Sequence, residues 1–414
     1  MAMPPAPPGG ALSRVTFRDV FSVREYRALW CAQLLSLLGD QLALVALTWL
    51  VYERSGSALL TAGAYAVSLL PWVIGGPLLS GLADRYPRRE VMVVSDLGRA
   101  GLMLVMALPG TPLWALYCLL FGSTLLASPF SAARAALLPD ILPGERYVVG
   151  TAIGNITIQA GQVGGYAVGG LLVALLQPSV ALGLNAGTFL MSALLLGSRL
   201  RRRAAARVAS TRHSILPDAD AVAGMRLVWT DPTLRALTGL ALLCSFYVVA
   251  EGMAVFYAGL LGAGPVSAGL LLAAGPTGAV IGSVVLARWV SPQRRLRLMG
   301  PLAGAACAAL IPYAAEPGLA IAAVLLALSG AASAYQLAAN AAFVTAVPPD
   351  LRGQAFGLVQ ALMYVGQGVA VALAGACAQV WSAGTVIAAA GVLGCLAAAL
   401  AGWAWRKTFR PSFG

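Results

Sequence analysis

Two long apolar runs of the sequence are joined by the short charged stretch GLADRYPRR, residues 81–89. Four of its nine residues are charged, whereas the runs on either side, 57–80 and 91–109, carry few charges. A run of about 20 apolar residues is long enough to cross a hydrocarbon core of roughly 30 Å as a helix. The pattern therefore predicts a polar turn between two membrane-spanning helices.

The same alternation of apolar runs and polar turns continues along all 414 residues. Hydrophobic residues make up 59% of the chain and charged residues 10%, whereas a soluble protein has about 25% charged residues. Because lipid offers the backbone no hydrogen bonds, the runs must be helices. We predict an all-α membrane protein with twelve transmembrane helices. The runs cover residues 26–52, 57–80, 91–109, 112–133, 148–176, 179–198, 235–262, 266–290, 297–314, 318–345, 354–380 and 383–405.

The distribution of positive charge predicts the orientation of these helices. All but two of the 27 Lys and Arg residues lie in the tails or in alternate loops; the exceptions are Arg54, in an opposite loop, and Arg99, inside a run. Loops rich in Lys and Arg face the cytoplasm. We predict a multi-pass protein of the bacterial inner membrane with both termini in the cytoplasm. The net charge of +12 then reflects topology and not nucleic-acid binding.

A polar stretch near the middle of the chain divides the runs into two sets of six. The string RALxxxxLL begins at Arg27 and again at Arg235, where the first and seventh runs start, which indicates a duplication. Two six-helix bundles of this kind form a known transporter plan, with the substrate site between them. The expected parts are a cytoplasmic tail 1–25, a first bundle 26–198, a cytoplasmic linker 199–234 with a short helix, a second bundle 235–405 and a cytoplasmic tail 406–414.

The stretch 81–89 resembles the signature loop of the major facilitator superfamily, G-x-L-A-D-R-x-G-R-[RK], with Pro87 in place of the second glycine. The resemblance implies a secondary transporter with the superfamily's fold of two pseudo-symmetric six-helix bundles. It also implies that this loop latches the two halves together on the cytoplasmic side when the transporter opens outward. An ordinary charged loop is the simpler alternative. The latch would use Gly81, Asp84, Arg85, Arg88 and Arg89.

The run 148–176 resembles the antiporter motif of superfamily exporters, G-x-x-x-G-P-x-x-G-G, with Tyr166 at the proline position. The motif glycines are Gly161, Gly165, Gly169 and Gly170. Other strings, such as Leu38-Gly39-Asp40 and residues 129–140, resemble the drug/proton antiporter group that includes macrolide-efflux proteins and enterobactin exporters. This resemblance implies proton-coupled efflux of a small drug-like, macrolide or siderophore-like compound.

Ionisable residues inside a membrane are expensive and mark functional sites. Asp40 and Glu251 lie near the middle of the first and seventh runs, which are equivalent helices of the two halves. We predict that Asp40 is the main proton-coupling carboxylate and that Glu251 is a second coupling site or a group that recognises a cation. A helix-packing hydrogen bond at Asp40 and a solvated cavity position without coupling at Glu251 are the alternatives.

Two further charges share one helix face in the run 91–109. Asp96 and Arg99 are three residues apart, so their side chains can pair. We expect a structural or gating ion pair that does not contact substrate. Arg134, at the end of the fourth run, is expected to join the network of Asp84 in the latch.

Uncharged polar side chains are few within the runs, which suits an apolar or amphipathic solute in the cavity. Contacts between helices are the alternative for each of them. The predicted cavity residues are Gln33, Asn155, Gln159, Gln162, Tyr247, Gln336, Asn340, Tyr364 and Gln367.

Nothing in the sequence indicates an enzyme or a cofactor. The motifs G-x-S-x-G and the phosphate-binding loop are missing, and no metal-ligand spacing occurs. His213 is the single histidine, and we expect it to be a solvated loop residue. We therefore predict no cofactor and no metal. The expected partners are a small-molecule substrate, protons and the lipid bilayer, and the protein is expected to be a monomer. A proton symporter that imports a nutrient and a non-transporting membrane receptor or assembly protein are the alternatives.

Overall fold

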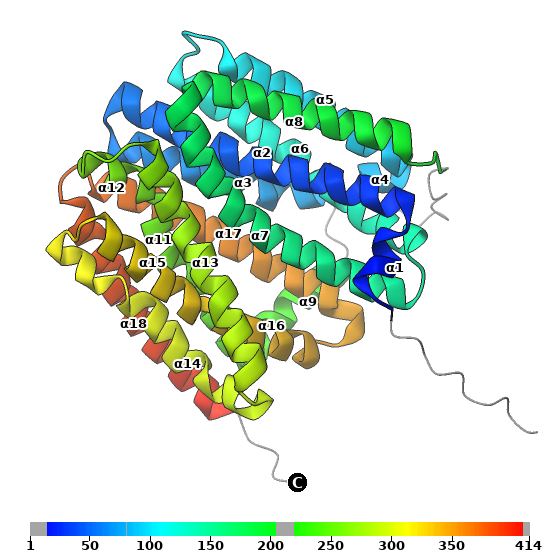
Figure 1. Ribbon diagram of the computed structural model, residues 1–414. Coiled ribbons are helices and arrows are strands. Elements are labelled where there is room, and N and C mark those ends of the chain that lie inside the picture. The colour runs from blue at the N-terminus through cyan, green and yellow to red at the C-terminus, as the bar shows by residue number, and fades with distance from the viewer. Residues whose placement is uncertain (1–14, 80, 204–218, 409–414) are drawn as a thin grey trace, which may run out of the picture.

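The computed structural model describes residues 15–79, 81–203 and 219–408, and every described element is helical. The first half is an all-α bundle (Figure 1). Its helices are α1 (Phe17–Phe21), α2 (Arg24–Ser55), α3 (Ala58–Leu79), α4 (Leu82–Arg85), α5 (Arg88–Ala107), α6 (Leu113–Ile141), α7 (Glu145–Leu176) and α8 (Pro178–Arg199).

The short helix α9 (Ala219–Thr230) leads into the second bundle and lies where the sequence predicts a helix in the linker. The second half contains α10 (Pro232–Leu242), α11 (Cys244–Gly252), α12 (Ala254–Leu260), α13 (Pro265–Trp289), α14 (Pro292–Ala308), η1 (Ile311–Ala315), α15 (Leu319–Ser333), α16 (Tyr335–Ala346), η2 (Pro349–Leu351), α17 (Arg352–Cys377) and α18 (Ala383–Thr408).

The prediction of an all-helical membrane protein is confirmed. Eleven spans of the described chain are long and apolar enough to cross a membrane. The remaining predicted span is α5, which runs beside α8 (Figure 1). This helix is long enough to cross a membrane, but it is less apolar than the other eleven because Glu90, Asp96 and Arg99 lie within it.

Several spans differ from the sequence-based expectation, among them the tenth, which was expected over 318–345 and is divided at Ala334 into α15 and α16. The fourth was expected to end at residue 133, but α6 continues to Ile141 because Leu137 and Leu138 extend its buried apolar face. The seventh was expected to be one helix over 235–262, but it is divided into α10, α11 and α12. The divisions fall at Leu243 and Met253, which are the cap residues between successive helices.

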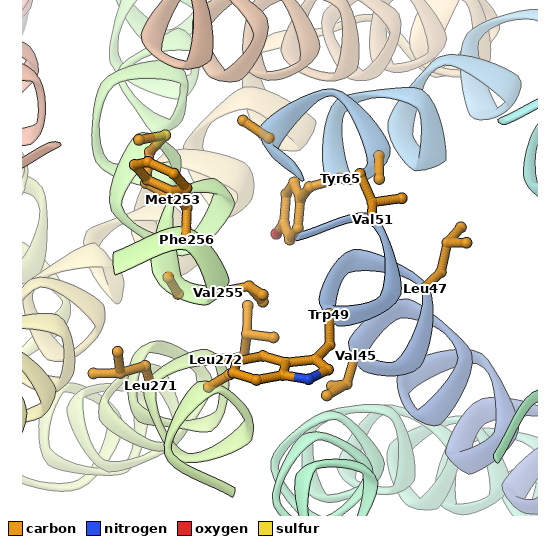
Figure 2. Close-up of a cluster of buried hydrophobic side chains, with 14 of the residues drawn as sticks. Val45, Leu47, Trp49, Val51, Tyr65, Met253, Val255, Phe256, Leu271 and Leu272 are labelled. Carbon is orange, nitrogen blue, oxygen red and sulfur yellow. The ribbon is translucent and has the colours of Figure 1, made fainter. Parts of the chain in front are cut away.

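One end of the bundle carries α1, α4 and α9 (Figure 1), and we call it the terminal face. The opposite end carries the loops that follow α2, α12 and α17, and we call it the closed face. At the closed face one apolar cluster includes side chains of both halves. Figure 2 shows Trp49 and Tyr65 of the first half beside Val255, Phe256 and Leu272 of the second.

Close backbone contacts accompany this shared cluster. Helices α7 and α13 meet at Gly170 and Gly269, where a Cβ atom on Gly170 would lie 2.6 Å from the Pro265 carbonyl oxygen. Helices α3 and α17 meet at Gly375, where a Cβ atom would lie 2.8 Å from Ala62. Only glycine allows helices to approach this closely. The two halves are therefore tightly joined at the closed face.

The terminal face is built differently. Its described apolar side chains form two separate clusters, one with residues from Val20 to Leu200 and one with residues from Val228 to Trp405. Each cluster belongs to one half only. A cavity of about 420 Å³ lies near this face and is lined by Gln159 of the first half and mainly by α10, α16 and α17 of the second. The halves thus share a core at one end and separate toward the other.

Candidate substrate cavity and its ion pairs

A central cavity of about 610 Å³ lies between the two halves. Its lining comes from α2, α3, α5, α6 and α7 of the first half and from α11, α13, α15 and α17 of the second. Four charged side chains line it: Asp40, Arg99, Arg134 and Glu251. A volume of this size is typical of small-molecule sites. Asp40 and Glu251, which the sequence places near mid-membrane, are thus joined in the lining by two arginines.

Asp40 and Arg99 form an ion pair at the wall of this cavity. The Arg99 Nη2 atom donates a hydrogen bond to Asp40 Oδ1, and Nη1 donates to the Ser36 hydroxyl at 2.9 Å. The Arg99 side chain is 3% exposed and that of Asp40 is 37% exposed. The guanidinium also lies 4.1 Å from the centre of the Phe189 ring. Asp40 is therefore open to the cavity, and its carboxylate is bound by the largely buried guanidinium of Arg99.

Asp96 completes the network on the side away from the cavity. Its Oδ1 atom lies 4.0 Å from Arg99 Nη1, and its Oδ2 atom accepts a hydrogen bond of 2.5 Å from the Ser192 hydroxyl. Asp96 is fully buried. The pairing of Asp96 with Arg99 is present at the predicted spacing. Arg99 also lines the cavity, and its nearest carboxylate is Asp40, which a linear sequence does not place beside it.

The string that contains Asp40 also has a packing role. Gly39 lies against the side chains of Asn185 and Thr188 on α8, which leave no room for a Cβ atom. This glycine brings α2 and α8 together beside the ion pair. The string therefore contributes a carboxylate to the cavity, at Asp40, and a close contact between two helices, at Gly39.

Glu251 lies on the opposite wall of the cavity. The Tyr65 hydroxyl donates a hydrogen bond of 3.2 Å to Glu251 Oε2. Tyr65 belongs to α3 and Glu251 to α11, so this bond joins the two halves. Gly275 on α13 lies directly against the Glu251 carboxylate and would clash with it if it had a side chain. The carboxylate is thus positioned by three helices.

Arg134 lies in the wall of the central cavity. Its Nη1 atom donates a hydrogen bond of 2.9 Å to Gln33 Oε1, and both side chains line the central cavity. We expected Arg134 to act in the latch with Asp84. The Asp84 side chain lies outside the described part of the structure. The described contacts of Arg134 are with α2 and with the cavity.

The predicted uncharged cavity residues fall into three groups. Gln33, Gln159, Gln162, Tyr247, Tyr364 and Gln367 line the central cavity. Gln336 and Asn340 line the second cavity, and Gln336 Nε2 donates a hydrogen bond of 2.5 Å to the Tyr247 hydroxyl. Asn155 is exposed and lines neither cavity.

Three cavity residues were not singled out from the sequence. Tyr65 and Ser36 are ordinary members of apolar runs, and only their contacts with Glu251 and Arg99 distinguish them. Trp72 stacks against Tyr364 across the two halves, with ring centres 6.2 Å apart and planes inclined by 19°. An aromatic residue within a hydrophobic run carries no signal of its own. Among the described residues, no group of three or more His, Cys, Asp or Glu could hold a metal ion, and His213 lies outside those residues.

Comparison with known proteins adds the family. The sequence profile of the Major Facilitator Superfamily matches residues 29–326, which is most of the chain. The chain belongs to the Major Facilitator Superfamily. It is a secondary transporter and not an enzyme. The resemblance seen in the loop 81–89 is thereby confirmed.

Similar proteins in the superfamily include transporters from several bacteria. The chain is 29% identical over 366 residues to the enterobactin exporter EntS of Shigella dysenteriae, a match that covers 84% of each protein. It is 31% identical over 169 residues to the uncharacterized MFS-type transporter YfiS of Bacillus subtilis. That match covers 41% of this chain and 40% of YfiS.

Solved structures share the fold at low sequence identity. The nucleoside transporter NupG, as its D323A mutant, matches with a TM-score of 0.74 at 14% identity and covers 93% of this chain and 100% of its own. A bacterial homologue of the iron transporter ferroportin matches with a TM-score of 0.67 at 16% identity, covering 93% and 98%. These likenesses show the Major Facilitator Superfamily fold.

The superfamily loop makes its described contacts within the first half. Arg88 Nη1 lies 2.6 Å from Asp140 Oδ2 of α6, and Arg89 donates hydrogen bonds to the Leu196 and Gly197 carbonyl oxygens at the end of α8. Gly81 and Arg85 are exposed. The loop therefore ties α5 to α6 and α8 in this conformation.

The antiporter-motif glycines of the superfamily all lie at helix contacts. Gly161, Gly165 and Gly169 face α2 at Leu37, Gln41 and Leu42 respectively. Gly170 instead faces Gly269 of the second half. Tyr166, at the proline position, lines the central cavity.

Proposed function

We propose that the protein is a proton-coupled exporter of small amphipathic compounds that works by alternating access. The single observation that carries the proposal is the hydrogen bond from Tyr65 to Glu251, which joins the two halves inside the central cavity. A transporter couples ion binding to conformational change when the ion alters contacts between its moving parts. A titratable group in such a contact meets that requirement.

The orientation of the protein follows from charge. The terminal face carries nearly all of the Lys and Arg residues of the loops, so the positive-inside rule assigns it to the cytoplasm. The halves share one core at the closed face and have separate cores at the terminal face. The described conformation is therefore the inward-open state in this proposal. An exporter loads its substrate in this state.

Two carboxylates supply the coupling. A proton on Glu251 replaces a charge-assisted hydrogen bond to Tyr65 with a weaker neutral one. A proton on Asp40 removes its ion pair with Arg99 and leaves Arg99 to the buried Asp96. Each event changes the contacts of a helix that lines the cavity. In the opposite, outward-open state, the loop with Asp84, Arg85 and Arg89 latches the halves at the terminal face.

The direction of transport is supported by the antiporter-motif glycines and by the similarity to the enterobactin exporter EntS over 84% of the chain. The cavity of about 610 Å³ accommodates a drug-sized molecule. Glutamine amides and the Trp72–Tyr364 stack lie in the same lining. This combination suits a solute with an apolar body and a few polar groups, as in drugs, macrolides or siderophores.

The test uses proteoliposomes with an imposed pH gradient and a panel of macrolides, dyes and siderophores. We expect the gradient to drive uptake into those proteoliposomes in which the protein is inserted inside out. A proton uncoupler should abolish this uptake. Asp40→Asn and Glu251→Gln should each reduce the uptake that the pH gradient drives. Neither variant should change counterflow, which is the exchange of labelled for unlabelled solute at equal concentrations on the two sides. Unchanged drive in both variants would refute the proton coupling, and the absence of any counterflow in the wild type would refute transport of these solutes.

A further inference from the structure

Arg134 is a cation in the central cavity that has no carboxylate partner among the described side chains. The ion pairs of the cavity wall involve Arg99 with Asp40 and Asp96. Arg134 makes one described hydrogen bond, to the neutral side chain of Gln33. An arginine inside a membrane protein normally faces a cavity or the bundle interior and pairs with an acid or with backbone carbonyl groups. Among the described side chains, Arg134 therefore presents a positive charge to the cavity without an acidic partner.

A glycine and an amide lie beside the Arg134 guanidinium. Gly154 of α7 faces the guanidinium, and a Cβ atom on this glycine would lie 3.8 Å from Arg134 Nη1. Gln33 accepts the Arg134 hydrogen bond with Oε1, so its amide nitrogen points away from the cation. Both N–H groups of this amide are donors, and none has a described acceptor. A cation and an amide donor thus lie side by side in one lining.

We propose that Arg134 and the Gln33 amide bind the acidic group of the transported solute, which is an organic anion with a carboxylate or a comparable oxyanion. The proposal rests on the transport function above and names the class of its substrate. The guanidinium offers a planar pair of N–H donors that matches two oxygens of a carboxylate. A bound anion would give the Arg134 guanidinium a partner of opposite charge.

The remainder of the cavity defines the rest of the solute. Trp72 and Tyr364 stack across the halves, and both line the same cavity as Arg134. Aromatic faces of this kind favour contact with flat apolar groups. The substrate class is therefore an aromatic or otherwise apolar molecule with one acidic end.

Binding to the purified full-length protein tests this assignment directly. Equilibrium dialysis in a neutral detergent compares 1-naphthoate with the neutral, similarly sized 1-naphthamide. We expect the wild type to prefer 1-naphthoate. Arg134→Gln should weaken 1-naphthoate binding at least about tenfold and leave 1-naphthamide binding unchanged, which also shows that the variant is folded. Arg134→Lys keeps the charge without the planar pair of donors and should be intermediate.

Arg235→Gln is the matched control, because Arg235 is exposed at the start of α10 and lines neither cavity. It removes the same charge and should change nothing. Equal 1-naphthoate affinity of Arg134→Gln and wild type, or a wild type without preference for 1-naphthoate, overturns the proposal. Displacement of 1-naphthoate by an equal concentration of phosphatidylglycerol would assign the subsite to a lipid headgroup and overturn the assignment to a solute.

The outcome is separate from that of the transport assay. The wild type could prefer 1-naphthoate in a way that depends on Arg134 and yet show no pH-driven transport. This result would support the anion subsite and refute the proposal of a proton-coupled exporter. Driven transport together with equal binding by Arg134→Gln and wild type refutes only the subsite.

Discussion

Tyr65 donates a hydrogen bond of 3.2 Å to Glu251, and the two residues belong to different halves of the bundle. The bond lies in the wall of the central cavity and next to the apolar cluster that both halves share. Any movement that opens the closed face must separate these two side chains. The pair therefore connects a titratable group in the cavity to the seam between the halves.

Removing the Tyr65 hydroxyl should shift the conformational equilibrium toward the state that is open at the closed face. A hydrogen bond to a charged group contributes about 1.5–3 kcal/mol, which corresponds to roughly a tenfold shift or more. Spin labels on the two halves at the closed face would report the shift for Tyr65→Phe. Tyr117→Phe is the control, because the Tyr117 hydroxyl bonds the Leu60 carbonyl oxygen within the first half. Equal label distances in both variants would contradict the prediction.

Replacing Arg99 should destabilise the first half strongly. Arg99→Leu leaves the fully buried Asp96 with only the Ser192 hydroxyl, and an uncompensated buried charge costs about 3–5 kcal/mol. The thermal unfolding temperature in detergent should fall, and adding Asp96→Asn to Arg99→Leu should restore part of the loss.

The Arg88–Asp140 pair supplies the comparison for this measurement. Its side chains are 21% and 45% exposed, and pairs of this kind contribute about 0–1 kcal/mol. Arg88→Gln should therefore change the unfolding temperature little. If Arg88→Gln lowered the unfolding temperature as much as Arg99→Leu, burial of the ion pair would not explain the loss of stability in Arg99→Leu.

A side chain at Gly170 should prevent the halves from joining at the closed face. A Cβ atom there would lie 2.6 Å from the Pro265 carbonyl oxygen and 3.0 Å from Gly269 Cα. We expect Gly170→Ala to reduce transport at least about tenfold, since α7 and α13 can no longer meet. Gly164→Ala on the same helix has open space around it and should retain wild-type transport. Retained transport in Gly170→Ala would contradict the assignment of this contact to the moving seam.

The short helix α1 should respond to acid through Asp19. Hydrogen bonds from the Thr16 backbone and hydroxyl hold the pKa of Asp19 below its usual 3.8. A lowered pKa stabilises the folded state above the unfolded value, and this contribution disappears as pH falls through the lowered pKa. Amide hydrogen exchange of α1 should accelerate below about pH 4. Asp19→Asn should remove this pH dependence, and an unchanged profile would contradict it.

The fold was predictable because it depends on properties that are local in the sequence. Apolar runs of sufficient length, the polar break at 199–234 and the loop 81–89 each carry their signal in consecutive residues. The division of the seventh span at Leu243 and Met253 carries no such signal, since neither proline nor a polar run occurs there. Depth along equivalent helices was also enough to suggest Asp40 and Glu251, which both line the central cavity.

Partners of the charged residues were not predictable, because they depend on helix packing. The spacing of Asp96 and Arg99 suggested their pairing, but the closer contact of Arg99 is with Asp40 on another helix. The hydrogen bond from Arg134 to Gln33 also depends on packing, since the two residues are far apart in the sequence. Tyr65 was not noticed at all, since its importance comes from Glu251 in the other half.

The two apolar clusters at the terminal face, each confined to one half, limit what a change of state has to disrupt. Neither half needs to repack its own interior when the cavity closes at one face and opens at the other. Only the seam formed by α3 with α17 and α7 with α13, and the shared cluster beside it, has to come apart. Side chains that face the solute can consequently diverge between relatives without weakening either half, which allows one scaffold to acquire new cargoes.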